Sequence, residues 1–108
     1  MITDTITEET ARKLSGSIAY VGDTNTEAFN TLKSVHPEVK VLSVKEVQGQ
    51  EFDNVVINID WNYDFNQNAS YLEFLRKLYT MISRGRTNSI IIDNNLTHII
   101  QGNDISNR

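Results

Sequence analysis

The sequence contains no cysteine, a single proline and no long apolar run, and each absence narrows what the protein can be. Without cysteine the chain forms no disulfide and no thiolate metal site, which favours an intracellular origin. No stretch approaches the ~20 apolar residues of a membrane-spanning helix, and no signal-peptide pattern opens the chain. We therefore expect a cytoplasmic protein that does not associate with a membrane.

Basic residues are too few for a protein that binds nucleic acid by itself. Ten lysines and arginines stand against 14 aspartates and glutamates, which gives a formal net charge of −4. Affinity for nucleic acid comes mainly from clustered lysine and arginine. The balance argues against a self-sufficient nucleic-acid binder, although it leaves room for a small basic patch on an acidic domain.

Patterns for catalysis and metal binding are missing as well. The chain has no Gly-x-x-x-x-Gly-Lys-Ser/Thr segment, so it lacks the loop that cradles nucleotide phosphates, and it has no paired-acid segment to hold Mg²⁺. His36 and His98 have no neighbours at metal-ligand spacing, and we expect no metal site. The acidic residues form no obvious carboxylate pair for acid–base chemistry.

Short apolar runs alternate with helical patterns along the chain. Strands are expected at 17–22, 39–44, 54–60 and 89–93, with helices at 28–36, 70–83 and 94–102. This alternation predicts an α/β fold with a mostly parallel sheet of about four strands. Residues 1–16 are interpreted as an N-terminal helix or linker, 17–102 as the domain, and 103–108 as a loose tail.

Functional loops in such a fold are expected at the carboxyl ends of the strands, which here are 22–25, 45–51 and 60–61. The last of these opens an asparagine-rich loop with alternating aromatic residues. Its Trp61 could stack on the bases of a single strand, or the loop could fold back on its own domain.

The segment Val47–Asp53 is a polar loop with chemistry of its own. Gly49 would let the backbone turn sharply or approach a ligand closely. Glu51 offers a carboxylate to a ribose hydroxyl. The alternative is a plain strand connection whose glycine only makes a turn.

A second polar segment, Ser83-Arg84-Gly85-Arg86, lies between an apolar helical run and an isoleucine strand. A helix C-terminus favours cations by about 0.3–1 kcal/mol, which is one explanation of the arginines. Phosphate recognition is the other, because a planar guanidinium matches phosphate oxygens.

Together the two segments resemble motifs V and VI of superfamily 1 helicases. Val47–Asp53, followed by the strand at 55–57, looks like motif V, and Leu78–Arg86 looks like motif VI, usually Tyr-Val-Ala-x-Thr/Ser-Arg-Ala. The order of the motifs and the elements between them match the UvrD/Rep-like group, with the helicase IV-like branch closest. The resemblance covers about residues 17–93 and implies a small three-layer domain, the second RecA-like domain of such a motor.

The resemblance also implies roles for single residues. Arg84 matches the motif VI arginine, which reaches the γ-phosphate of ATP bound mainly by the other RecA-like domain. Glu51 matches the glutamate that contacts the ribose. Gln48 and Gly49 match the loop that links nucleotide state to the bound strand, and Tyr79 falls on a tyrosine expected to pack.

Some positions depart from the family pattern. Lys45 stands where many relatives carry histidine, so its contact with nucleic-acid phosphate would differ. Gln50 replaces a common leucine, and Met81 and Gly85 replace small residues or alanine. Arg86 has no secure counterpart, and it is interpreted as a solvated surface arginine or a contact to phosphate or an acidic partner.

The resemblance predicts part of an ATP-dependent DNA helicase or translocase. ATP and Mg²⁺ would be held by the first RecA-like domain of the same polypeptide, the full-length protein would bind single-stranded DNA, and the isolated chain would be inactive. The alternative is a non-catalytic α/β module that binds a protein partner or a nucleotide, because a fold does not fix a function.

Overall fold

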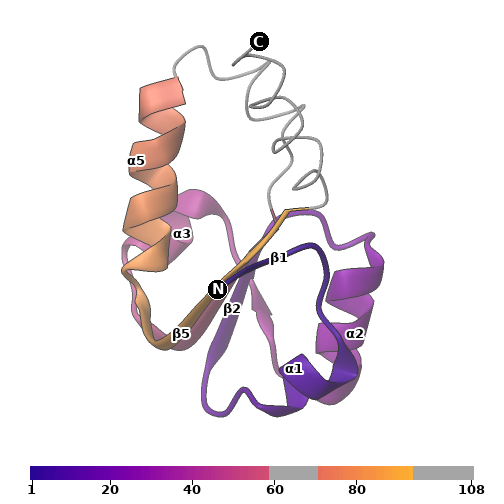
Figure 1. Ribbon diagram of the computed structural model, residues 1–108. Coiled ribbons are helices and arrows are strands. Elements are labelled where there is room, and N and C mark those ends of the chain that lie inside the picture. The colour runs from indigo at the N-terminus through magenta and orange to yellow at the C-terminus, as the bar shows by residue number, and fades with distance from the viewer. Residues whose placement is uncertain (59–70, 94–108) are drawn as a thin grey trace, which may run out of the picture.

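A computed structural model describes residues 1–58 and 71–93, with the backbone alone at 71–75. In this part of the chain five strands form one sheet in the order β1-β5-β4-β2-β3, and every pairing is parallel (Figure 1). The strands are β1 (Ile2–Thr3), β2 (Ile18–Val21), β3 (Lys40–Val41), β4 (Phe52–Asn58) and β5 (Gly85–Ile92). The helices are α1 (Glu8–Arg12), α2 (Glu27–Val35), α3 (Val44–Gln48) and α5 (Tyr71–Ile82).

Helices cover both faces of the sheet, as the near-continuous apolar strands require. In β2, side chains alternate between the faces: Ile18 and Tyr20 join the apolar cluster under α1 and α2, whereas Ala19 and Val21 join the cluster under α3 and α5. Figure 1 shows the two helix pairs on opposite sides of the strands. The predicted three-layer α/β fold is confirmed, with a parallel sheet of five strands.

Helices α1, α2 and α3 begin where side-chain caps satisfy free backbone N–H groups, and at α1 the Thr7 hydroxyl accepts from the Thr10 N–H. The Thr26 hydroxyl accepts from the Phe29 N–H at the start of α2. At α3 the Ser43 hydroxyl accepts from the Glu46 N–H, and the Glu46 carboxylate accepts from the Ser43 N–H, which is a complete capping box.

This capping box explains where the strand prediction for 39–44 was wrong. Only Lys40–Val41 is a strand, and α3 occupies 44–48, where a loop was expected. The two reciprocal hydrogen bonds at Ser43 stabilise a helical turn in a segment that is otherwise rich in β-branched residues. A second difference is β1, which the threonine-rich start of the chain did not indicate and which pairs with the carboxyl half of β5.

Helix α3 determines where the polar segments lie. The chain leaves the carboxyl end of β3, runs through α3, and enters β4 at Phe52, whose register partner in β5 is Gly85. Residues 49–51 therefore lie at the edge where the strands begin, which we call the amino edge, and not at the carboxyl ends as expected. The same edge carries the corner between α5 and β5.

Strand β5 begins with a bulge. Between the register pairs Phe52–Gly85 and Asn54–Asn88, β4 advances by two residues and β5 by three. The bulge brings the Asn88 carbonyl oxygen and the Ser89 hydroxyl against Gly85, where a Cβ would collide with both. The glycine, which stands where the resembled motif carries a small residue or alanine, is thus required by this backbone.

Three predicted features lie outside the described residues: the aromatic loop with Trp61, the helix at 94–102 and the tail at 103–108. Within the described residues no helix is long and apolar enough to cross a bilayer. The described part of the chain also contains no group of acidic, histidine or cysteine side chains that could hold a metal ion.

We expect Gly85→Ala to destabilise the domain by about 1–3 kcal/mol, because the added methyl group overpacks the bulge. Urea denaturation measures the change as a lower midpoint. Gly49→Ala is the matched control, since the nearest atom to a Cβ there is the Glu46 carbonyl oxygen at 3.9 Å. Equal effects of the two substitutions would contradict the description of the bulge.

Candidate functional site

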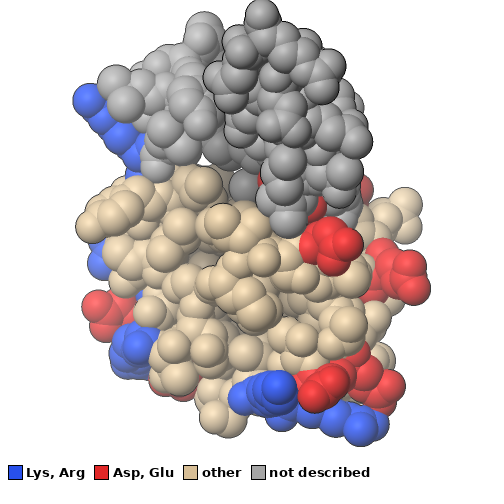
Figure 2. Space-filling model, viewed as in Figure 1, with Lys and Arg blue, Asp and Glu red and all other residues tan. Residues whose placement is uncertain are grey.

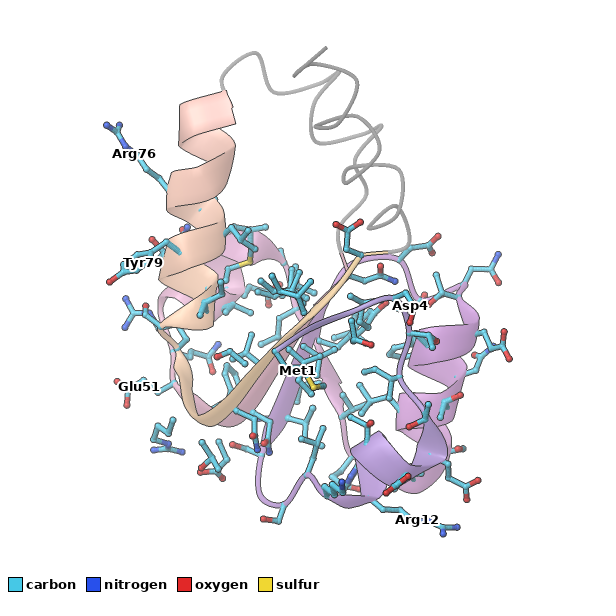
Figure 3. All side chains as sticks on the ribbon, in the orientation of Figure 1. Met1, Asp4, Arg12, Glu51, Arg76 and Tyr79 are labelled. Atoms are coloured by element: carbon cyan, nitrogen blue, oxygen red, sulfur yellow. The ribbon has the colours of Figure 1, made fainter. Side chains whose placement is uncertain are left out.

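Glu51 and Arg84 lie next to each other at the amino edge. They directly precede Phe52 and Gly85, the first register pair of β4 and β5. The Phe52 N–H donates to the Arg84 carbonyl oxygen at 2.9 Å, so the two segments are joined at this point. Residues 33 positions apart in the sequence are thereby brought to one place, and the labelled Glu51 lies near the C-terminal end of α5 (Figure 3).

The Arg84 side chain is half-buried and carries an unusual donor. Its Nε is fully enclosed and has no hydrogen-bond partner among the described residues. Buried donors are nearly always paired, so an unpaired one calls for an explanation. An anionic group that binds at the amino edge and turns the guanidinium toward itself would explain it, since a guanidinium binds phosphate or carboxylate through its N–H groups.

Gly49 ends α3 and has an ordinary backbone conformation, with φ −91° and ψ 1°. A side chain would be tolerated there, because the nearest atom to an added Cβ is 3.9 Å away. The domain itself therefore does not need a glycine at this position. Gln48 is half-buried at the C-terminal end of α3, and Lys45, the second residue of this five-residue helix, is exposed.

A polar group that the sequence analysis missed joins three strands at the same edge. One Asp53 oxygen accepts hydrogen bonds from the Ser17 N–H at 2.9 Å and the Ser17 hydroxyl at 3.3 Å. The other oxygen lies 3.4 Å from the Arg86 guanidinium. The hydrogen bond from the Ser17 N–H, together with the nearby Arg86 charge, holds the pKa of Asp53 below its ordinary value.

Beside this group lies a fully buried asparagine, Asn54. Its amide donates to the carbonyl oxygens of Ser15 and Ser17 at 2.8 and 3.2 Å, and its side-chain oxygen accepts from Asn88 at 2.8 Å. A polar residue directly before the run Val55–Ile57 was the available signal, because buried amides need partners. The partners themselves are far away in the sequence and could not be read from it.

The comparison with known families agrees with this geometry. The model of the UvrD-like helicase C-terminal domain matches residues 38–92, just over half of the chain. The chain belongs to the UvrD-like helicase C-terminal domain family. The matched region contains α3, β4, α5 and β5, and with them both segments that meet at the amino edge.

Membership of this family makes the chain a domain of the superfamily 1 helicase type, as the two motifs indicated. The assignment to the helicase IV-like branch stays a prediction. No curated protein matches the chain. The domain boundaries and the roles of single site residues also stay predictions.

Tyr79 does not pack inside the UvrD-like domain, and this expectation was wrong. Its side chain is 74% exposed, and it points away from α5 on the same side as Arg76 (Figure 3). In the part of α5 whose side chains are described, the buried stripe consists of Leu78, Met81 and Ile82, which follow helical spacing. Tyr79 falls between these positions and faces outward.

The carboxyl edge of the UvrD-like domain carries a closed polar network. The Tyr20 hydroxyl donates to the Asp23 carbonyl oxygen at 2.5 Å and accepts from the Asn58 amide at 3.0 Å. Burial raises the pKa of Tyr20, and the hydrogen bond from Asn58 offsets part of that rise. These groups satisfy one another's hydrogen bonds. The polar residues after β2, where a ligand loop was expected, are therefore explained by contacts within the domain.

Charged side chains surround one face of the domain without forming a basic patch. On the face in Figure 2 the centre is uncharged, lysine and arginine lie along the left and lower edges, and most aspartate and glutamate lie on the right and lower right. Part of this pattern is the ion pair of Arg12 with Glu8 on α1. The face agrees with a domain whose net charge is −4.

We expect Asp53→Asn to be less stable than the unchanged domain at neutral pH, with a difference that narrows as the pH falls. The lowered pKa means that the native state holds the Asp53 proton more weakly than the unfolded chain. The contribution is present above about pH 4 and is lost as the pH falls through the native pKa. Urea midpoints between pH 7 and 2.5 measure it, and a constant difference would contradict the assignment.

Proposed function

We propose that the chain is the second motor domain of an ATP-dependent superfamily 1 DNA helicase or translocase. The nucleotide and its Mg²⁺ would be held by a first RecA-like domain of the same polypeptide, and the amino edge would close against them. Hydrolysis of the nucleotide would supply the free energy for movement along single-stranded DNA. By itself this chain would be inactive, and a cytoplasmic location remains a prediction.

The unpaired Nε of Arg84 carries this proposal. The guanidinium is half-buried at an edge of the sheet, with one enclosed donor that nothing in the described part of the domain accepts. A phosphate group approaching that edge would meet a permanently charged side chain, and it would satisfy the enclosed donor once the guanidinium turned toward it. Arg84 would then stabilise the negative charge that develops on the transferring phosphoryl group, which is the role of an arginine finger.

The positions of Glu51 and Gly49 are also consistent with a nucleotide that approaches the amino edge. Glu51 is exposed beside the Arg84 backbone, so its carboxylate is available to accept a hydrogen bond from a ribose hydroxyl. The domain itself does not require a glycine at residue 49. We infer that the missing side chain makes room for the nucleotide or for the first domain.

Helix α3 would connect the nucleotide to the DNA strand. It ends at Gly49 on the amino edge, and Lys45 is its second residue, four positions before that glycine. A displacement of Gly49 on nucleotide binding would move a rigid five-residue helix and the lysine with it. Lys45 is exposed and would contact a DNA phosphate, and Trp61, outside the described residues, would stack on a base.

Exposed Tyr79 favours a second candidate function. A large aromatic side chain that is 74% exposed is a common anchor in protein interfaces. A non-catalytic module that binds a protein partner, or a nucleotide, through this fold would carry such a residue without any ATP turnover. The reading frame that encodes this chain distinguishes the two candidates. Only the motor requires a phosphate-binding Gly-x-x-x-x-Gly-Lys-Ser/Thr segment encoded before residue 1.

We expect Arg84→Ala to lower the rate of ATP turnover about 10³–10⁵-fold in the motor formed with the nucleotide-holding domain. Arg84→Lys should remain strongly impaired, because an ammonium group cannot reproduce the planar fork. Phosphate release under saturating Mg²⁺–ATP measures the rate.

Arg12→Ala is the matched control, since Arg12 is an exposed arginine on α1 whose ion pair lies with Glu8. Its turnover should equal that of the unchanged motor. Normal turnover in Arg84→Ala, or ATP hydrolysis by the isolated 108-residue chain, would contradict the proposed function.

A further inference from the structure

Asp53 ties together the first residues of three neighbouring strands. Its carboxylate accepts from Ser17 just before β2, its own N–H donates to the Ser17 hydroxyl at 2.9 Å, and its second oxygen faces Arg86 in β5. Asp53 itself belongs to β4, which lies between the other two strands. One side chain thus joins β2, β4 and β5 at the amino edge.

The loop before β2 is shaped around this carboxylate. Gly16 has a φ of +89°, a conformation that other residues rarely adopt, and a Cβ there would collide with the Asp53 carboxylate. The close contact and the two hydrogen bonds from Ser17 hold one side of the carboxylate. Its remaining oxygen is thereby kept in place for Arg86.

The position of the Arg84 side chain depends on the backbone around it. Within the described residues its Nε finds no acceptor, so that donor does not hold the guanidinium in place. The backbone is fixed before and at Arg84, where its N–H donates to the Met81 carbonyl at 3.1 Å and its carbonyl accepts from Phe52. After the corner, the next contact with β4 is the ion pair between Arg86 and Asp53.

We propose that Asp53 and Arg86 are a positioning pair for Arg84. The backbone bond between residues 52 and 84 and the side-chain contact between residues 53 and 86 join the same two segments on either side of Gly85. With both in place the corner cannot rotate about one attachment, and Arg84 keeps one orientation. The role of this orientation in binding phosphate rests on the proposed function. The fixed orientation itself is a property of the isolated chain and can be measured there.

The ion pair between Asp53 and Arg86 also gives Arg84 and Arg86 different roles. Arg86 is already engaged by a carboxylate, so it does not compete with Arg84 for a phosphate. The side chains of Arg86 and Asp53 are 55% and 36% exposed, and ion pairs this exposed add little to global stability. Loss of the pair in Arg86→Gln should therefore appear in the order of Arg84 and hardly in the unfolding midpoint, whereas Asp53→Asn also weakens the hydrogen bonds from Ser17 and lowers the midpoint.

The test follows the Arg84 Nε–Hε group of the ¹⁵N-labelled chain by NMR, through its exchange with water and its relaxation order parameter. In the unchanged chain the enclosed Hε should exchange more slowly than that of exposed Arg76. Arg86→Gln and Asp53→Asn should each speed Arg84 Hε exchange by about tenfold, as expected when a local opening becomes easier. Arg86→Lys, which keeps a cation opposite Asp53, should recover most of the protection.

Arg12→Gln removes an exposed ion pair on α1 and should leave the Arg84 signal unchanged. Arg86→Gln keeps the informative comparison if Asp53→Asn fails to fold, because it leaves the Ser17 hydrogen bonds intact. Unchanged Arg84 exchange in a folded Arg86→Gln chain would overturn the proposal, as would an equal change in Arg12→Gln. Neither result depends on ATP turnover. The exchange experiment can therefore contradict the positioning pair without contradicting the proposed function, and the turnover experiment can do the reverse.

Discussion

The parallel pairing of β4 with β5 at their first residues is the constraint on which the site depends. It places the Phe52 N–H against the Arg84 carbonyl oxygen at 2.9 Å and so brings the segments before each strand together. In a parallel sheet all strands begin at one edge, so the residues that precede two adjacent strands become neighbours. Glu51 and Arg84 meet for this reason and need no contact between their own side chains.

Polar side chains then hold the strands together at this amino edge. Asn54 and Asp53 bind the loop before β2 on one side and residues of β5 on the other. The bulge at Gly85 adapts the start of β5 to these contacts. The result is a fixed edge, and the Arg84 Nε is the buried side-chain donor without a partner among residues 1–58 and 71–93. A domain that completes an active site held by another domain would need such an arrangement: a fixed backbone and a free, charged side chain.

Much of the fold could be predicted from the sequence because apolar runs and helical spacing are local patterns. The strands β2 and β4, the apolar half of β5 and the long helices α2 and α5 follow directly from them, although β5 begins at Gly85, four residues before the predicted start. β1 could not be predicted, since two residues of a threonine-rich segment become a strand only through pairing with β5. The helix at 44–48 was hidden because the capping bonds of Ser43 and Glu46 outweigh the preference of nearby valines for strands.

The candidate site was predictable in part for a similar reason. The two motifs are contiguous in the sequence, so their resemblance to helicase motifs pointed to Glu51 and Arg84. The roles of Asp53 and Asn54 depend on Ser17, Arg86 and Asn88, which only the three-dimensional arrangement brings near. Tyr79 was misread because a helical face can be assigned only when the buried stripe is known.

The central claim is that the amino edge faces the phosphates of a nucleotide held by another domain. The most direct measurement is a structure of the motor trapped with Mg²⁺, ADP and aluminium fluoride, which mimics the transferring phosphoryl group. We expect the Arg84 guanidinium to lie within hydrogen-bond distance of the fluoride ligands, at about 3 Å. An analogue bound at the carboxyl edge, or an Arg84 side chain turned away from it, would contradict the account.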